Sequence, residues 1–192
     1  IQVVGSVPPG SALRRRGARP GDAVVVSGTL GDAALGLHLW QGRADRASPD
    51  VAFLLERLHR PTPRVSLGQA LRGCATAAVD ISDGLAADLQ HLLAASAVGA
   101  VVDVDRLPLS EPGLRFGGRR NQWRNALTGG DDYELCFTVP RSRVHELDAL
   151  ASRLGVVLTR VGSVEPQSGL RLMHSDRTPV NLDGWGFRHF DG

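Results

Sequence analysis

The stretch Ala-Val-Asp-Ile-Ser-Asp-Gly-Leu at residues 78–85 decides the fold prediction for this chain. Small and apolar residues lead into it like a buried strand, and leucines at positions 85, 89, 92 and 93 follow it at helical spacing. The side chains of Asp80, Ser82 and Asp83 therefore stand where a strand ends and a helix begins. Ligands of α/β sheets bind at such junctions, where backbone N–H groups point toward anions. Because carboxylates repel anions, we expect a cation between them: Mg²⁺ takes one or two carboxylates together with phosphate oxygens.

An ordinary helix N-terminus explains the same spacing. Ser82 or Asp83 is a good N-cap, and Asp is favourable in the first helical turn. Asp80 favours the metal interpretation, since a carboxylate at the end of an apolar strand is costly to bury unless it is paired or metal-bound. The spacing alone leaves both interpretations open.

Strands and helices alternate on both sides of this stretch. We expect strands over residues 1–7, 23–27, 76–80, 100–104, 134–139, 156–164 and 170–173. We expect helices over residues 33–40, about 48–59, 65–71, 84–97 and 143–154, with an irregular segment up to about residue 125. This alternation indicates an α/β or α+β domain.

Composition excludes several classes of protein. The 192 residues include no apolar run long enough to span a bilayer, and the net charge of +2 argues against nucleic acid as a partner. All 22 basic residues are arginine, so a phosphate-binding lysine, a Schiff-base lysine and a lysine base are all excluded. Cys74 and Cys136 have neither metal-site nor disulfide spacing, which indicates a reducing, cytoplasmic location.

A second candidate site is the run Gly-Gly-Asp-Asp-Tyr-Glu at residues 129–134, directly before a predicted strand. Its glycines permit close approach of a ligand or a positive φ, and its three acids are suited to a cationic group or a metal. A glycine turn with solvated carboxylates explains the run equally well.

Two further patterns concern phosphate. Arg14, Arg15 and Arg16 precede a glycine turn and carry guanidinium forks suited to phosphate, although a solvated charge run is the simpler interpretation. Gly28-x-x-Gly31 before a helix resembles a phosphate-cradling turn, but tight packing of strand against helix explains it equally well.

Taken together, the motifs resemble the thiamine-monophosphate kinase family of the AIR synthetase-like superfamily. The resemblance covers essentially the whole chain, and its motifs follow the family's order: Arg15-x-Gly-Ala-x-Pro-Gly-Asp, Val26-Ser-Gly-x-x-Gly-Asp-Ala, Arg60-Pro-x-Pro-Arg, Asp80-Ile-Ser-Asp-Gly-Leu, Gly129-Gly-Asp-Asp-Tyr-Glu-Leu and the closing His189-Phe. The resemblance implies an AIR synthetase C-terminal-domain-like mixed sheet with packed helices. It also implies transfer of the γ-phosphoryl group of ATP to thiamine monophosphate, which gives thiamine diphosphate.

Site residues carry over from this resemblance position by position. Asp80 and Asp83 would ligand Mg²⁺, with Asp83 also catalytic, while Ser82 and Arg15 would contact ATP. The substrate residues would be Asp131, where the family more often has Glu, and Phe187, an aromatic contact. Phosphoryl transfer depends mainly on positioning and charge neutralisation, so carboxylates, metal and arginine suffice without lysine.

The resemblance also divides the chain. It implies that residues 1–20 are the final strand and linker of an N-terminal ATP-binding domain, and that residues 21–192 are the C-terminal AIR synthetase-like domain. In the family the N-terminal half supplies further metal-binding aspartates, a glycine-rich nucleotide loop and the homodimer interface. We therefore expect this chain alone to have little or no kinase activity.

Two other functions remain as alternatives. Individual motifs are shared with AIR synthetase and selenophosphate synthetase relatives, so another ATP-dependent synthetase of the superfamily is the first. A non-catalytic binding module that retained the fold is the second, and the presence of both Asp80 and Asp83 argues against it.

Overall fold

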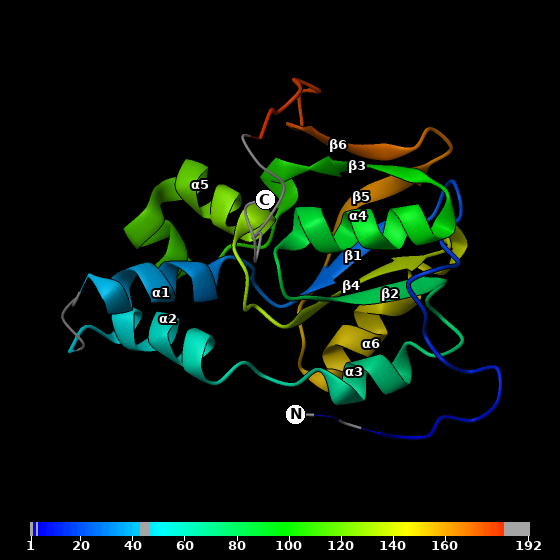
Figure 1. Ribbon diagram of the computed structural model, residues 1–192, viewed down its shortest axis with the longest axis horizontal. Coiled ribbons are helices and arrows are strands. Elements are labelled where there is room, and N and C mark those ends of the chain that lie inside the picture. Colours follow the sequence, from blue (N-terminus) through cyan, green and yellow to red (C-terminus); the bar gives the residue numbers. More distant parts are fainter. Residues whose placement is uncertain (1, 3, 43–46, 183–192) are drawn as a thin grey trace.

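A computed structural model describes residues 2, 4–42 and 47–182 and contains a six-stranded mixed sheet (Figure 1). Its strands are β1 (Ala23–Ser27), β2 (Ala77–Ile81), β3 (Gly99–Asp103), β4 (Glu134–Val139), β5 (Leu158–Glu165) and β6 (Gly169–Met173). Their order across the sheet is β2-β4-β1-β5-β3-β6. The β3–β6 pair is parallel and the other four neighbouring pairs are antiparallel. The predicted mixed sheet with packed helices is confirmed.

Helices cover both faces of this sheet. They are α1 (Asp32–Gln41), α2 (Pro49–His59), α3 (Val65–Ala70), α4 (Leu85–Ser96), α5 (Glu111–Thr128) and α6 (Glu146–Leu154), with 3-10 turns η1 (Val104–Arg106) and η2 (Arg141–Arg143). Helices α4 and α5 pack on one face, α3 and α6 on the other, while α1 and α2 form a pair at one end (Figure 1). In the described part of the chain, no helix is long and apolar enough to cross a membrane.

The sequence of β1 explains its central place in the sheet. Every residue of Ala-Val-Val-Val-Ser is buried. Val24 and Val26 join the core under α4 and α5, whereas Ala23 and Val25 join the core under α3 and α6. A strand that is apolar on both faces is stable only when helices cover both sides.

Helix α4 contributes the apolar face predicted for it. Leu85, Leu89, Leu92 and Leu93 are all buried against the strands. Burying a leucine side chain is worth about 1.5–3 kcal/mol, so these four side chains fix the helix on the sheet. The position of the loop before α4 follows from that packing.

Strand β2 lies at an edge of the sheet, which the sequence did not predict. Its burial alternates, and Asp80 is exposed rather than buried. The argument that a buried Asp80 needs a metal therefore fails, because water already solvates this carboxylate. The segment before β1 lies along the outer edge of β2, where the Ala78 N–H donates to the Arg14 carbonyl over 2.9 Å.

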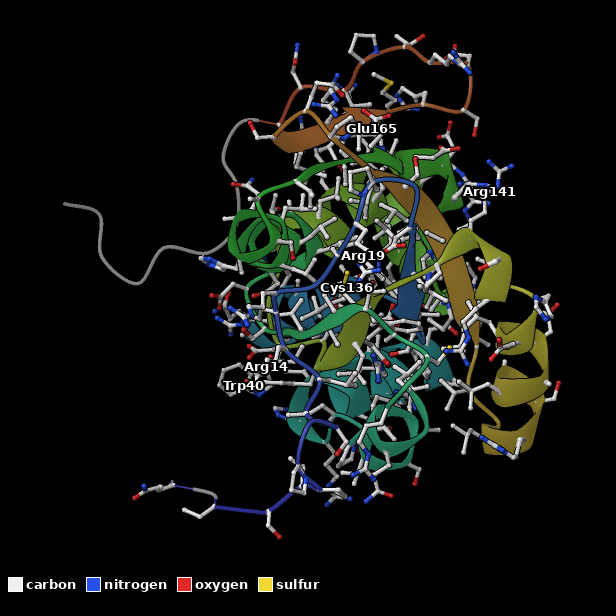
Figure 2. The ribbon with its side chains drawn as sticks, turned by 90° about the vertical axis from the view of Figure 1, so that its right-hand side faces the viewer. Arg14, Arg19, Trp40, Cys136, Arg141 and Glu165 are labelled. Carbon is white, nitrogen blue, oxygen red and sulfur yellow. The ribbon has the colours of Figure 1, made fainter. Side chains whose placement is uncertain are left out.

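The segment before β1 packs along the sheet, where Figure 2 labels Arg14 and Arg19. Ala18 is buried in the core, and the Gly21 N–H donates to the Val164 carbonyl on β5. The strand expected over residues 1–7 does not form at the residues described there, Gln2 and 4–7. With no neighbouring strand beside them, an apolar pattern alone does not make a strand.

The segment expected to be irregular contains α5 instead. Gly117 and Gly118 obscured this helix in the sequence, and the backbone does break at Gly118, with φ 66° and ψ 158°. The part after the break contributes buried Trp123, Ala126 and Leu127 to the core. Tertiary packing outweighs the poor helix propensity of the glycines.

Candidate active site

The two acidic motifs, far apart in the sequence, form one site. Strands β2 and β4 are antiparallel neighbours, with Ile81 opposite Glu134, so the end of β2 meets the start of β4. The loops that extend these strands are joined by backbone hydrogen bonds. The Asp131 N–H donates to the Ser82 carbonyl over 3.0 Å, and the Tyr133 N–H donates to the Ile81 carbonyl over 2.9 Å.

Glycine makes this close approach possible. At Gly84 the backbone has φ +105°, and a Cβ there would lie 2.7 Å from the Leu127 carbonyl oxygen. At Gly130 a Cβ would lie 2.5 Å from the Ser82 carbonyl oxygen. Any side chain at these positions would push the two loops and the end of α5 apart.

A pocket of about 650 Å³ opens beside the joined loops. Its lining residues come from α1, the end of α5 and both loops: Ala33, Ala34, Leu37, His38, Ser82, Asp83, Asn125, Thr128, Gly129, Gly130, Asp131 and Tyr133. One wall, on α1, is largely apolar, while the loops contribute two carboxylates. A small organic ligand with an apolar face and a positive charge would fit such a pocket, with the face against α1 and the charge near the carboxylates.

Three carboxylates lie around Tyr133: Asp83 and Asp131 line the pocket, whereas Asp80 does not. Asp80 and Asp131 are exposed, Asp83 is half-buried, and Asp131 has a positive φ of 68°. Burial raises the pKa of Tyr133, and the charges of Asp131, Asp80 and Asp83 raise it further. The electrostatic potential at the Tyr133 hydroxyl is therefore negative, and a cation would be attracted there.

The donor set fits a cation held partly by phosphate. Among the described residues, the carboxylates of Asp80 and Asp83 have no hydrogen-bond or ion-pair partner in the protein, so their oxygens are free. In that same part of the chain, no group of three or more His, Cys, Asp or Glu side chains is placed to hold a metal. Two carboxylates with the remaining ligands from phosphate and water is the pattern typical of Mg²⁺.

The backbone N–H groups of Ser82 and Asp83 are not available to a ligand anion, because a carboxylate of the protein already accepts from them. Both N–H groups donate to Oδ2 of Asp88 over 2.9 Å. The N-cap of α4 is Gly84, and no side chain caps it. The expectation that these N–H groups face a ligand anion is therefore wrong, and so is the expectation that Ser82 or Asp83 caps α4, because the buried Asp88 of the helix itself accepts from the N–H groups.

The acidic run 131–134 divides into outward and inward residues. Asp132 and Glu134 are buried, which neither interpretation of the run predicted. Oδ2 of Asp132 accepts from the Gly31 N–H over 2.7 Å, and Oδ1 accepts from the Ala33 N–H over 3.4 Å. Asp132 thus caps α1 from another part of the chain, and burial raises its pKa to about 7.

Glu134 joins the site loop to α2 and to the start of α3. Its two oxygens accept from Nε and Nη2 of Arg64, each over 2.6 Å, and one also accepts from Nη2 of Arg57 over 3.1 Å. The Ser27 hydroxyl donates to it over 2.6 Å. The second arginine of Arg60-Pro-x-Pro-Arg64 is therefore an anchor for the site loop.

The same network decides between the interpretations of Gly28-x-x-Gly31. Gly28 has φ +60°, and a Cβ there would collide with the Glu134 carboxylate. The Gly31 N–H is already bonded to Asp132. The structure favours the packing interpretation over a phosphate cradle.

Arg15, a predicted ATP contact, lies away from the pocket. Arg15 is exposed, and its carbonyl accepts from the Ser96 hydroxyl at the far end of α4 from Asp83. Arg15 does not line the pocket. Phe187 lies outside the described residues.

Sequence reasoning missed several residues that line the pocket. The Tyr133 hydroxyl donates to Oδ1 of Asp131 over 3.2 Å and lies at the pocket. His38 lies one helical turn after Ala34, so the period of α1 was a usable signal for it. Asn125 and Thr128 gave no such signal, because α5 itself was not predicted.

Comparison with known proteins identifies relatives along nearly the whole chain. The family described as AIR synthase related protein, C-terminal domain, matches residues 19–175. Thiamine-monophosphate kinase of Salmonella typhimurium is 46% identical over 99% of this chain and 59% of its own length. The corresponding Escherichia coli kinase is 44% identical over the same shares of the two chains.

Solved structures agree with these relatives. The crystal structure of thiamine-monophosphate kinase from Stenotrophomonas maltophilia has a TM-score of 0.83 and 49% identity, and covers 86% of this chain and 54% of its own. A structure described as AaThiL complexed with AMPPCP and TMP has a TM-score of 0.77 and 36% identity, and covers 93% of this chain and 54% of its own. The chain thus spans somewhat more than half the length of these relatives.

Proposed function

The chain belongs to the family described as AIR synthase related protein, C-terminal domain, and we propose that it is the C-terminal part of a thiamine-monophosphate kinase. The reaction proposed for the whole protein is transfer of the γ-phosphoryl group of ATP to thiamine monophosphate, giving thiamine diphosphate. The joined acidic loops carry this proposal. They place two free carboxylates, Asp80 and Asp83, beside a pocket with an apolar wall and an acidic rim.

On the nucleotide side, Asp80 and Asp83 would hold Mg²⁺ through their unpartnered oxygens. When bound, the ion would neutralise charge on the phosphates of ATP as the phosphoryl group moves. Asp83 is the catalytic carboxylate in this proposal because it also lines the pocket. Ser82 would contact ATP through its side chain, since its N–H is bonded to Asp88. Arg15 is proposed as a contact to the nucleotide phosphates on family resemblance alone.

On the acceptor side, the pocket suits a cationic aromatic substrate. The thiazolium ring of thiamine monophosphate carries a positive charge, and Asp131 presents a carboxylate at the pocket. The Tyr133 hydroxyl donates to Asp131 and so restricts the rotamers of that side chain. The apolar wall of α1, with Ala34 and Leu37, would exclude water from one face of the ring. Phe187 is proposed as an aromatic contact to the ring on family resemblance alone.

Calorimetric titration of thiamine monophosphate into this chain tests the acceptor site. We expect saturable binding that Asp131→Ala weakens at least tenfold, because the thiazolium loses its carboxylate partner. Asp148→Ala is the matched control, since Asp148 is an exposed acid on α6 away from the pocket. Equal weakening by both variants, or no binding by folded wild-type chain, would contradict an acceptor site formed by these residues.

The same proposal covers the rest of the protein. The chain alone would show little or no phosphoryl transfer, since the N-terminal half of the relatives is outside it, and near-normal turnover would contradict this. The whole enzyme is proposed as a cytoplasmic homodimer that uses ATP. If AIR or selenophosphate-type substrates competed with thiamine monophosphate for the pocket, another synthetase of the superfamily would be favoured instead.

A further inference from the structure

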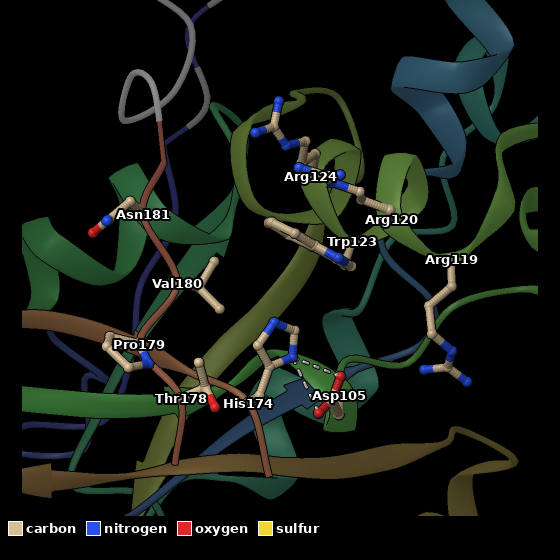
Figure 3. Close-up of a pocket in the computed structure, with 10 residues that line it drawn as sticks. All are labelled: Asp105, Arg119, Arg120, Trp123, Arg124, His174, Thr178, Pro179, Val180 and Asn181. Atoms are coloured by element: carbon tan, nitrogen blue, oxygen red, sulfur yellow. Dashed lines mark hydrogen bonds and ion pairs between the residues drawn. The ribbon is translucent and has the colours of Figure 1, made fainter. Parts of the chain in front are cut away.

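A second pocket, of about 460 Å³, lies on the other side of α5 (Figure 3). It is lined by Asp105, Arg119, Arg120, Trp123, Arg124, His174, Thr178, Pro179, Val180 and Asn181. None of these residues lines the pocket beside the acidic loops. Helix α5 therefore contributes to two separate pockets, one lined by two acids and the other by three arginines. The proposed kinase reaction uses only the first of them.

The charge of this second pocket is positive. Arg119, Arg120 and Arg124 contribute three guanidinium groups, and none forms an ion pair with an acid in the described part of the chain. The one acid in the lining, Asp105, is engaged already. Its oxygens accept from the Ser175 N–H over 3.0 Å and contact Nδ1 of His174 at 3.1 Å.

One donor in this pocket is buried without an acceptor. The Nε atom of Arg124 is shielded from water and makes no hydrogen bond in the described structure. Because Nε is shielded even from water, an anion in the pocket would pair with the terminal nitrogens of this guanidinium instead. The guanidinium carbon of Arg124 lies 5.8 Å from the centre of the Trp123 ring, so an acceptor there would lie beside the indole.

Flat and apolar groups line the rest of the pocket. Trp123, His174 and Val180 face one another across it (Figure 3). Because Nδ1 of His174 contacts Asp105, the other ring nitrogen is left turned toward Trp123. A planar ring matches this gap in shape, and guanidinium forks match phosphate oxygens in geometry.

We propose that this second pocket binds a phosphate ester of a small planar ring compound, of the mononucleotide class. The ring lies against Trp123 and Val180, and the phosphate is bound by the surrounding arginines. The pocket volume is within the range of small-ligand sites, about 300–1,000 Å³. This proposal is independent of the kinase reaction, because the two pockets share no residue.

Tryptophan fluorescence tests the proposal, with AMP as the probe. Replacing Trp40 and Trp185 by Phe leaves Trp123 as the single tryptophan of the 192-residue chain, so that excitation selective for tryptophan reports on it alone and not on Tyr133. We expect a saturable change on addition of AMP, and weaker binding of adenosine and of inorganic phosphate, because each carries only part of the recognised structure. No saturable change at millimolar AMP would overturn the proposal.

Arginine variants locate the site. Arg119→Gln and Arg124→Gln are expected to raise the dissociation constant for AMP at least tenfold, while Arg141→Gln, on exposed η2 (Figure 2), leaves it unchanged. Arg119 is exposed, so its variant remains informative if Arg124→Gln does not fold. Equal weakening by all three variants would mean diffuse charge attraction and would overturn the proposal.

Asp83→Asn separates this proposal from the kinase reaction. We expect the AMP-induced change at Trp123 to persist in Asp83→Asn, whereas binding in the first pocket is altered. Loss of the Trp123 signal in Asp83→Asn, with retention in Arg119→Gln, would assign the binding to the first pocket and overturn a second site. Failure of thiamine monophosphate to bind bears only on the proposed kinase function.

Discussion

The two strand-to-helix turns of this domain look alike in sequence and differ in what their acids do. In the β1–α1 turn, Asp32 is buried, and Asp132 from another loop caps the helix. In the β2–α4 turn, Asp88 of the helix itself accepts from the loop N–H groups, so Asp80 and Asp83 have free oxygens. An acid beside a helix N-terminus can therefore be structural or functional, and its burial and partners distinguish the two. The first turn is closed by internal ion pairs, and the second is open to ligands.

Glu134→Ala should be the most disruptive change, because it opens the closed turn. The substitution leaves Arg57 and Arg64 half-buried without their shared carboxylate. Breaking a buried ion pair by removing one partner costs about 3–5 kcal/mol, so we expect the free energy of unfolding to fall by that amount. Chemical denaturation measures it. Glu56→Ala, at an exposed pair with Arg60, is the matched control and should cost no more than about 0.5 kcal/mol.

Asp132→Asn should change how stability depends on pH. The pKa of Asp132 is raised by burial from 3.8 to about 7 in the folded protein, so the folded state binds this proton more tightly than the unfolded state. Its contribution to stability is therefore complete below the unfolded pKa and is lost as the pH rises through the folded pKa. As the pH rises from 3.8 to about 7, we expect the free energy of unfolding of the wild type to fall more steeply than that of Asp132→Asn. The difference in slope should be up to about 1.4 kcal/mol per pH unit. Denaturation at a series of pH values measures both slopes, and equal slopes would mean that Asp132 does not titrate in this range.

Asp88→Ala tests the internal acceptor of the open turn. The variant leaves the N–H groups of Ser82 and Asp83 without their acceptor, at a cost of about 1–3 kcal/mol in the free energy of unfolding. Asp88→Asn retains one acceptor oxygen and should recover most of that loss. If both variants lost equal stability, the charge of Asp88 rather than its hydrogen bonds would hold the loop.

Asp80→Asn and Asp83→Asn should have the smallest effect on stability. Neither carboxylate has a protein partner in the described part of the chain, so each change should alter the free energy of unfolding by no more than about 0.5 kcal/mol. Both should weaken Mg²⁺-dependent binding of AMPPCP, measured by calorimetry with and without the metal. A loss of stability as large as that of Asp88→Ala would make the β2–α4 turn structural, like the β1–α1 turn.

The sequence predicted those parts of the fold that depend on local pattern. Strand β4 and the buried leucines of α4 were placed correctly, because periodicity survives in a single segment. Helix α5 was missed because its turn at Gly118 breaks that periodicity. The edge position of β2 was missed as well, since strand order is set by pairing with distant segments.

The motifs brought out several residues of the candidate site but not the contacts that these residues make. Asp83 and Asp131 were identified from motifs, and the structure places both at one pocket. The bonds of Glu134 to Arg64 and of Asp132 to Gly31 join segments distant in sequence, so no local pattern reveals them. A run of acids therefore indicates a site without showing which acids face the ligand.

The central place of β1 has a consequence for synthesis on the ribosome. This strand leaves the ribosome well before its neighbours β4 and β5, which lie more than a hundred residues later in the sequence, at Glu134–Val139 and Leu158–Glu165. Until they emerge, the apolar Ala-Val-Val-Val of β1 has no partner in the sheet. Non-local strand pairing of this kind slows folding and prolongs exposure of a strand that can aggregate. The sheet can therefore close around β1 only after β5 has emerged, and until then only the helices made in between can cover this strand.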